Sequence, residues 1–309
     1  MTFTQLRTFA MVAELGSLRA AAAALGVSEP AVSMAVAALR TDLGDALFVR
    51  TATGIALTPG GRALAARARE LVRLADRTRR EVGEAAGAAD RLLVLATAAC
   101  AEHVGPMIAT FARHAPRARV ELTVGSTECA AGALADGSAD LALGVRPAPP
   151  EGQAIDCVPF LRYARVPVVA PGTSPAAPWS SRLWLTGPAG FEDGSAEERW
   201  AAAHGRPRIE RCADEAKALD RVRAGEGAML ALGHAVREDL RRGSLVRVPV
   251  PRTPVNGLWW ASVPGDGRAT AAARALQRFL TTPEATTALM ARPGRRDRAR
   301  PRVRVELWS

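Results

Sequence analysis

Three glycines divide the beginning of this chain into short apolar segments, and their spacing limits what those segments can form. Gly16, Gly26 and Gly44 each follow an apolar run, and Ser17 and Ser28 stand just after the first two. Serine is favoured at the start of a helix and glycine at its end, so the pattern predicts three helices joined by very short turns. Two short helices joined in this way form a helix-turn-helix, whose second helix lies in the major groove of DNA.

The segment SEPAVSMAVAAL, residues 28–39, is expected to be the second helix of that motif. Ser28 can cap it, and Pro30 falls in the first turn, where a missing N–H costs little. Its predicted packing face is an apolar stripe made of Ala31, Val32, Ala35, Val36 and Leu39. The exposed polar set is then very short, namely Ser28, Glu29 and Ser33.

Two β-prone pieces follow, ALFVR and GIALT, and together they predict a two-stranded wing. Thr58 and Pro59 then begin a long helical segment in which apolar and small residues recur at alternating spacings of four and three. This heptad seam consists of Leu64, Ala68, Leu71, Ala75, Thr78 and Val82. We interpret the seam as a dimerisation contact with a second copy of the chain. Packing on the chain's own first helices is the alternative.

From residue 90 onward, apolar β-prone runs alternate with helical segments. Buried strands are predicted at RLLVLATA, ARVELTVGS, ADLALGV, RVPVVAP, RLWLTGP, PRIERC, EGAMLAL, LVRVPV and NGLWWASV. Strands that alternate with helices imply a parallel sheet, so the predicted fold class is α/β. Two α/β lobes joined by crossing strands would leave a ligand cleft at the carboxyl ends of the strands.

The positive charge of the chain lies mainly at its two ends. Of a net charge of +10, residues 1–89 supply +3 (11 Arg against 8 acidic residues) and residues 292–309 supply +5 (7 Arg against 2). Basic ends favour a polyanionic partner such as DNA. For the Arg-rich tail, plain solvated charge is the alternative.

No residue pattern points to catalysis or to a metal. The chain has no G-x-S-x-G, no P-loop and no H-E-x-x-H, and its four cysteines form no C-x-x-C pair. We therefore expect no catalytic residues, no metal site and no cofactor, and reduced thiols rather than a Cys100–Cys212 redox pair. The chain also lacks a long uncharged apolar run and a secretory signal pattern, so we expect a cytoplasmic protein with no membrane partner.

Several spaced elements together resemble the winged helix-turn-helix of the LysR-type transcriptional regulators. They are FAMVAELGSLRAAAAALGVSEPAVS, LGDALFVR and LTPGG, and the match runs without a gap over about sixty residues. The later part, with VEL, ALADGSADLAL and RAGEGAML in the expected order, resembles the effector-binding domain of the same family, which is like periplasmic solute-binding proteins. That part departs from the family at Leu232, where proline is common.

The resemblance divides the chain into four parts. Residues 1–58 would be the winged helix-turn-helix DNA-binding domain, and residues 59–89 the linker (dimerisation) helix with a hinge. Residues 90–291 would form the two-lobed effector-binding domain, with lobe I at 90–161 and 265–291 and lobe II at 162–264. Residues 292–309 would be the Arg-rich C-terminal tail.

The resemblance also implies which residues meet DNA. Ser28, Glu29, Pro30 and Ser33 would sit at the DNA end of the recognition helix, and Arg50 of the wing would approach the backbone or minor groove. The chain departs from the family at Glu29, where Gln is usual, and at Met34, Ala35 or Ala37, where a polar or basic residue is usual. Glutamate can accept from cytosine N4 but repels phosphate. Phosphate contacts would then come from Arg50, Arg19, Arg40 and Arg62, although a solvated helix face is the alternative for Arg40.

Effector contacts are expected at the carboxyl ends of the strands. By position these are Thr97, Cys100, Gly125, Ser126 and Thr127, and by family analogy Arg146 and Thr186. Helix N–H groups near Thr97 and Cys100 could bind an anion. A capping or packing role is the alternative for each of these residues taken alone.

The sequence therefore predicts a sequence-specific transcriptional regulator that responds to a small molecule of unknown identity. Its expected partners are double-stranded DNA carrying an interrupted inverted repeat, a second copy of itself as homodimer or homotetramer, and RNA polymerase. The alternatives are a DNA-binding regulator without ligand response, a solute-binding protein and an enzyme that uses the cleft.

Overall fold

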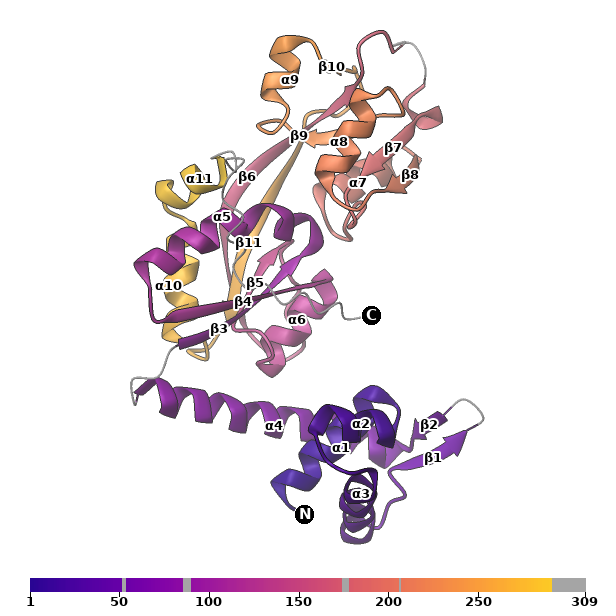
Figure 1. Ribbon diagram of the computed structural model, residues 1–309, viewed down its shortest axis with the longest axis vertical. Coiled ribbons are helices and arrows are strands. Elements are labelled where there is room, and N and C mark those ends of the chain that lie inside the picture. Colours follow the sequence, from indigo (N-terminus) through magenta and orange to yellow (C-terminus); the bar gives the residue numbers. More distant parts are fainter. Residues whose placement is uncertain (52–53, 86–89, 174–177, 206, 291–309) are drawn as a thin grey trace. The chain divides into compact units, whose positions relative to one another are not determined.

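The structure is a computed structural model that describes residues 1–51, 54–85, 90–173, 178–205 and 207–290 (Figure 1). The Arg-rich tail at 292–309 and its predicted role lie outside these residues. The chain divides into two compact units, Met1–Ala88 and Ala89–Ser309, and each is taken by itself below.

The first unit begins with three helices whose ends are fixed by the predicted caps. They are α1 (Phe3–Leu15), α2 (Leu18–Leu25) and α3 (Glu29–Leu43). The side chains of Ser17 and Ser28 accept hydrogen bonds from the N–H groups of Ala20 and Ala31, which satisfies free donors at the two helix starts. The glycines that end the helices are left-handed, with φ between 62° and 67°.

The wing and the long helix follow as the sequence predicts. Strands β1 (Phe48–Thr51) and β2 (Gly54–Leu57) pair antiparallel, and α4 runs over Pro59–Ala85. Asp45 ties the two parts together, because one of its carboxylate oxygens accepts from Leu47 N–H (2.6 Å) and from the Thr58 hydroxyl (2.7 Å). Gly61 allows the helix to pass the strand, since a Cβ there would lie 1.8 Å from the Leu47 carbonyl oxygen.

The core of the first unit confirms most of the apolar stripe on α3 and corrects one position. Val32, Val36 and Leu39 are buried against a group that includes Phe9 and Phe48. Ala35 is half-buried, but Ala31 is exposed, because it lies in the first turn where the helix faces solvent.

The second unit starts with the predicted parallel arrangement. Strand β3 (Asp90–Thr97) pairs parallel with both β4 (Ala118–Gly125) and β5 (Leu141–Gly144). Helices α5 (Ala98–His114) and α6 (Thr127–Asp136) connect these strands. This is the α/β pattern expected from alternating strands and helices.

Two long strands correct the prediction of a purely parallel sheet. Strand β6 (Ile155–Val169) begins ten residues before the predicted start at Arg165, and it pairs antiparallel with β11 (Val255–Pro264). Both strands run from one half of the unit to the other (Figure 1). β9 (Met229–Leu232) and β10 (Val246–Arg247) also pair antiparallel with β6. Strands shared by two lobes must cross in both directions, so their pairing is antiparallel.

The remaining elements complete the two lobes. In lobe II, β7 (Leu183–Thr186) and β8 (Arg208–Arg211) pair parallel. The other helices are the 3-10 turn η1 (Trp179–Ser181), α7 (Ala196–Ala203), α8 (Glu215–Arg223), α9 (Arg237–Arg242), α10 (Ala271–Leu280) and α11 (Pro283–Met290). Each lobe has a core of its own, since Met107 and Leu276 pack in one while Trp184 and Val222 pack in others.

The lobe I core also contains residues of the second crossing strand. Trp259, Ala261 and Val263 pack there, although the predicted boundary at 264/265 assigned them to lobe II. Among the described helices, none alone is long and apolar enough to span a membrane. α2 and α3 pass that test only as a pair, bent by 111°.

Candidate functional site

The exposed face of α3 is almost free of charge. Ser28, Glu29, Pro30 and Ser33 are all exposed, as predicted for base-reading positions, and the Ser28 oxygen also caps the helix. Met34 projects beside them with 73% of its surface exposed. Met34 is the most exposed large apolar side chain among the described residues. The sequence already marked Met34, because it is among the positions where the family that the chain resembles usually has a polar or basic residue.

The four predicted phosphate-binding arginines differ in their surroundings. Arg19 of α2 and Arg62 of α4 are exposed, and Arg62 donates to the Leu57 carbonyl oxygen at 2.8 Å. Arg40 is half-buried instead. Its guanidinium lies 4.5 Å from the centre of the Phe48 ring and donates to the Phe48 carbonyl oxygen at 3.3 Å. Arg40 therefore holds the wing against α3, and its contact with phosphate stays a prediction. The side chain of Arg50 lies outside the described residues.

The heptad seam on α4 is used in two ways. Ala68 is fully buried with Leu6 and Ala10 of α1, and Leu64 packs against the same group. These two predicted dimerisation residues therefore belong to the chain's own core, which was the alternative interpretation. Further along the helix, Leu71 (45%) and Val82 (65%) are exposed, Thr78 is exposed and Ala75 is half-buried. Leu74, at 61% exposed, adds to this part of the seam.

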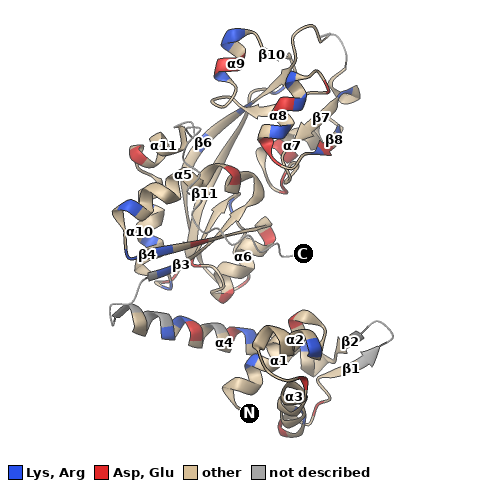
Figure 2. Ribbon diagram, in the orientation of Figure 1, with Lys and Arg blue, Asp and Glu red and all other residues tan. Residues whose placement is uncertain are grey.

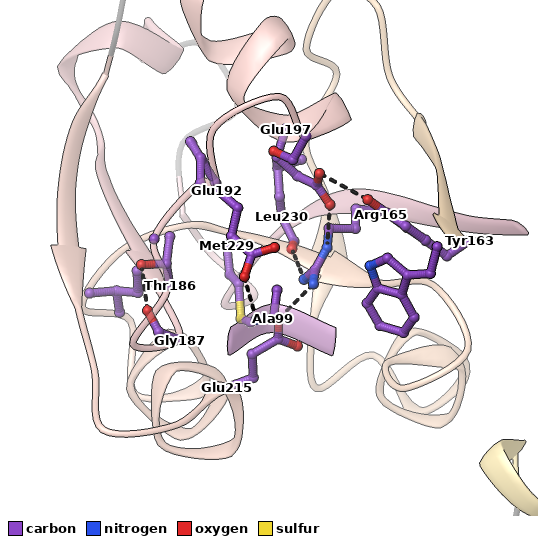
Figure 3. A pocket seen from close by; sticks show the side chains of 15 residues that line it. Ala99, Tyr163, Arg165, Thr186, Gly187, Glu192, Glu197, Glu215, Met229 and Leu230 are labelled. Atoms are coloured by element: carbon purple, nitrogen blue, oxygen red, sulfur yellow. Dashed lines mark hydrogen bonds and ion pairs between the residues drawn. The ribbon is translucent and has the colours of Figure 1, made fainter. Parts of the chain in front are cut away.

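A buried arginine joins several carboxylates in lobe II (Figure 3). Arg165 of β6 is 5% exposed, and its guanidinium lies 2.7 Å from carboxylate oxygens of both Glu197 and Glu215. It also donates to the Leu230 carbonyl oxygen at 3.1 Å, and the Tyr163 hydroxyl donates to Glu197 at the same distance. A charge this deep is stable only when it is paired and hydrogen-bonded. The sequence carried a signal, because an arginine within the apolar run YARVPVV requires a partner.

Each lobe has one glutamate that accepts a hydrogen bond from a backbone N–H of the other lobe. Glu192 of lobe II accepts a 2.8 Å hydrogen bond from Ala99 N–H in the first turn of α5 in lobe I. Glu102 of α5 accepts a 2.8 Å hydrogen bond from Glu215 N–H in the first turn of α8 in lobe II. His103 lies 3.3 Å from the Glu215 carboxylate. Each lobe thus supplies an anion to a helix start of the other, where the helix dipole and free N–H groups stabilise negative charge.

The buried position shifts the ionisation of these groups. Burial raises the pKa of both Glu192 and Glu102 above the usual glutamate value. Burial alone would also raise the pKa of Glu215, but the Arg165 charge and the His103 hydrogen bond outweigh it and lower that pKa to about 2. For Arg165, burial is outweighed by Glu215 and Glu197, so its pKa is raised. Arg165 and Glu215 are therefore charged at neutral pH.

Very little space remains among these side chains. The inner site, which we define as the space lined by Arg165, Thr186, Glu192, Glu197 and Glu215, has a volume of about 20 Å³. A cavity needs roughly 10–15 Å³ to hold one water molecule. The inner site is therefore closed, and its own carboxylates occupy the helix start at which an anionic effector was expected.

A second space between the lobes is open. The outer pocket has a volume of about 480 Å³, and its lining includes Arg146 and Trp260 from lobe I, Arg199 from lobe II and Arg162 of β6. The Arg146 guanidinium lies 5.1 Å from the centre of the Trp260 ring, within the range of a cation–π contact. No aspartate or glutamate is among the described residues that line this pocket.

The structure does not bring the predicted effector residues together. Thr186 lines the inner site and Arg146 the outer pocket, whereas Gly125, Ser126 and Thr127 line neither. Ser126 instead caps α6 by accepting from Cys129 N–H. Thr97 is 1% exposed at the start of α5.

Cys100 is also removed from the effector site. It is fully buried in the lobe I core, and burial raises the pKa of its thiol well above the usual value. Cys100 lines neither the inner site nor the outer pocket, so the structure places it as a packing residue of lobe I rather than at either space. Cys212 is half-buried, and both thiols are free.

Family comparisons agree with the geometry of both units. The family described as "Bacterial regulatory helix-turn-helix protein, lysR family" matches residues 3–62, and the "LysR substrate binding domain" matches residues 86–283. The chain belongs to the LysR family. Like its relatives, this LysR-type protein is a DNA-binding transcriptional regulator, and nothing in the matches indicates an enzyme family.

Individual relatives match this LysR-type chain over its whole length. An uncharacterized HTH-type transcriptional regulator of Mycobacterium tuberculosis is 39% identical over all of both chains, and the regulator CbbR of Rhizobium meliloti is 28% identical over 91% of this chain and 92% of its own. Among solved structures, full-length CbnR complexed with its target DNA is 25% identical, with a TM-score of 0.59, and the match covers 94% of this chain and all of CbnR.

Proposed function

We propose that this regulator reads an interrupted inverted repeat as a dimer or tetramer, and that an anionic small molecule bound in the outer pocket changes the DNA spacing it prefers. The open outer pocket carries the proposal, because its arginines come from both lobes while carboxylates are absent from its described lining. Its volume falls in the range of roughly 300–1,000 Å³ common for small-molecule sites. A ligand that touches both lobes favours one arrangement of them over another.

The charge of the outer pocket sets the expected class of effector. A LysR-family regulator of Corynebacterium glutamicum that shares the fold, LysG, binds the cation arginine as its effector (21% identity, TM-score 0.58, with 91% of this chain and 98% of LysG covered). The pocket in this chain is lined by Arg146, Arg162 and Arg199, so it favours a carboxylate or another anion. Trp260 adds an aromatic surface for an apolar part of the effector.

Base reading falls to Glu29, Ser33 and Met34 on the exposed face of α3. Glu29 can accept a hydrogen bond from cytosine N4, and Met34 can contact the thymine methyl group. Figure 2 shows α3 as a largely uncharged helix, and its charged residues are Glu29, Arg40 and Asp42. Arg19 and Arg62 remain candidates for phosphate contacts, together with Arg50. RNA polymerase would be the partner through which the bound regulator changes transcription.

The closed inner site favours a second candidate, a regulator that binds DNA without any effector. Hydrogen bonds from Glu192 and Glu102 to backbone N–H groups already join the two lobes, so no ligand is needed to hold the lobes together. Selection of bound sequences from a random DNA pool, with and without a panel of organic anions, separates the two. We expect an anion to change the selected half-site spacing in the wild type but not in Arg146→Gln with Arg199→Gln. Identical selections in every condition would favour the ligand-independent regulator.

A further inference from the structure

A second basin lies in the second unit, against lobe II. It has a volume of about 820 Å³, and its lining comes from β6, the loop after β9, α9, β10 and the residue before β11. Met290, at the end of α11 in lobe I, completes one side. The basin shares Arg162 and Tyr163 with the outer pocket, while the rest of its lining is different.

The floor of the basin is apolar. It includes Val166 of β6, Leu240 of α9, Leu245, Pro254 and Met290. Val166 and Leu245 are buried, whereas Met290 is 48% exposed and Val246, which also lines the basin, is 37% exposed. Apolar surface that stays open to water in a concave site is stabilised when an apolar body covers it.

The rim of the basin is basic. Arg162, Arg237, Arg241 and Arg247 line it with His234, and no described lining residue is acidic. Arg241 has a carboxylate partner in Glu238 at 3.2 Å. Within the described part of the chain, Arg162, Arg237 and Arg247 form no such pair, because the carboxylates of this lobe contact other arginines.

Other arginines of lobe II, outside the basin, are paired with carboxylates. Arg223 of α8 is held by Asp220 at 2.7 Å and by Asp239 at 2.9 Å, and Arg221 is held by Glu210 and Glu226. At the basin, Arg162, Arg237 and Arg247 have no carboxylate partner among the described residues, and only Arg241 is paired. Burial lowers the pKa of the half-buried His234, and the nearby charges of His103, Arg165 and Arg237 lower it further.

We propose that this basin is a second ligand site, specific for an organic anion that has one charged head and an apolar body. The head, a carboxylate, sulfonate or phosphate, would be held by Arg237 and Arg247, and the body would cover Leu240, Val246 and Met290. Arginine is suited to such heads because it offers two parallel N–H donors to two oxygens. The lining spans lobe II, a crossing strand and the last helix of lobe I, so an occupant adds contacts to both lobes.

The test uses the full-length protein and the probe 8-anilinonaphthalene-1-sulfonate, which carries a sulfonate on an aromatic body. We expect saturable binding by fluorescence, with octanoate competing and octylammonium not competing. Arg237→Gln with Arg247→Gln should weaken binding about tenfold, as expected for the loss of two charge-assisted hydrogen bonds at an open site. The loss should shrink at high salt, because exposed charges are screened.

Two controls separate this site from others. Arg208→Gln removes an exposed arginine of β8 that lines none of these spaces, and it should leave affinity unchanged. Arg146→Gln alters the outer pocket alone and should also leave affinity unchanged. Loss of binding in Arg146→Gln but not in the Arg237/Arg247 variant would overturn the proposal and place the anion between the lobes. Equal competition by octylammonium, or unsaturable binding, would also overturn it.

Discussion

The carboxylate of Glu192 in lobe II accepts a 2.8 Å hydrogen bond from the Ala99 N–H in lobe I. Glu102 makes the converse contact with the Glu215 N–H at the same distance. Each carboxylate satisfies a donor at a helix start that would otherwise need water or a ligand. The two lobes therefore hold each other through backbone groups, and the pair of contacts depends on the charge state of Glu192, which is half-buried, and of Glu102, which is exposed.

Glu192→Gln should make the protein more stable than the wild type as the pH rises. The folded pKa of Glu192 is raised by burial, so above the model-compound value of 4.5 the unfolded chain loses its proton first. Wild-type stability then falls with rising pH until the folded pKa is passed. Glutamine stays neutral and can still accept from Ala99 N–H. In thermal unfolding from pH 4 to 8, the melting temperature of Glu192→Gln should rise relative to that of the wild type as the pH increases. The control Glu151→Gln, at an exposed position, should show no such rise. The same pH dependence of the melting temperature in both variants would contradict the prediction.

Arg165→Met should destabilise the second unit by about 3–5 kcal/mol, because it removes the buried cation that pairs with both Glu197 and Glu215. Urea unfolding followed by tryptophan fluorescence measures this loss, since Trp184 and Trp259 are buried in this unit. Arg247→Met, at an exposed position, is the matched control and should change stability by less than about 0.5 kcal/mol. Similar losses of unfolding free energy in the two variants would show that the ion pairs of Arg165 do not stabilise the second unit.

If α3 meets DNA as we propose, Glu29→Gln should raise non-specific DNA affinity about fivefold at low salt, because it removes a negative charge from the proposed DNA-facing surface. It should also shift the selected base opposite this position from cytosine toward adenine. Gel shifts with random DNA and selection from a pool measure the two effects. Glu14→Gln, exposed on α1, serves as control, and an unchanged selected site in Glu29→Gln would remove Glu29 from the reading surface.

Leu71→Glu combined with Val82→Glu should convert the full-length protein from an oligomer to a monomer. Both side chains are exposed on α4, and burying a charge in an apolar seam is costly. Sedimentation velocity measures the change, with circular dichroism to check that the fold is kept. Ala66→Glu adds the same charge at an exposed position off the seam and should leave the oligomer intact. An oligomer of unchanged size in the double variant would exclude this seam as the contact.

The first unit was largely readable from sequence because its signals are local. Serine caps, glycine ends and the apolar stripe act within a few residues, so α2, α3 and the wing formed where they were expected. The errors came where a distant element intervened. Leu64 and Ala68, predicted as dimerisation contacts, pack against α1 of the same chain.

In the second unit, the sequence predicted the strands and helices better than it predicted the residues of the site. Its strands and several helices follow from alternating apolar runs, but the effector residues were chosen as the residues that follow strands. Of these, Cys100 packs into the core, and Gly125, Ser126 and Thr127 line neither space between the lobes. The side chains that do fill the inner site, Arg165, Glu192 and Glu215, are brought together from three separate segments.

By itself, the sequence determined the winged helix-turn-helix, the α/β class and the short exposed polar face of α3, because caps, periodicity and spacing act over neighbouring residues. Only the tertiary structure decided that Met34 is exposed, that Arg165, Glu192 and Glu215 fill the inner site, and that arginines gather around two open spaces. Those outcomes depend on which distant side chains neutralise one another. Charge pairing over a hundred residues of chain leaves no periodic trace in the sequence.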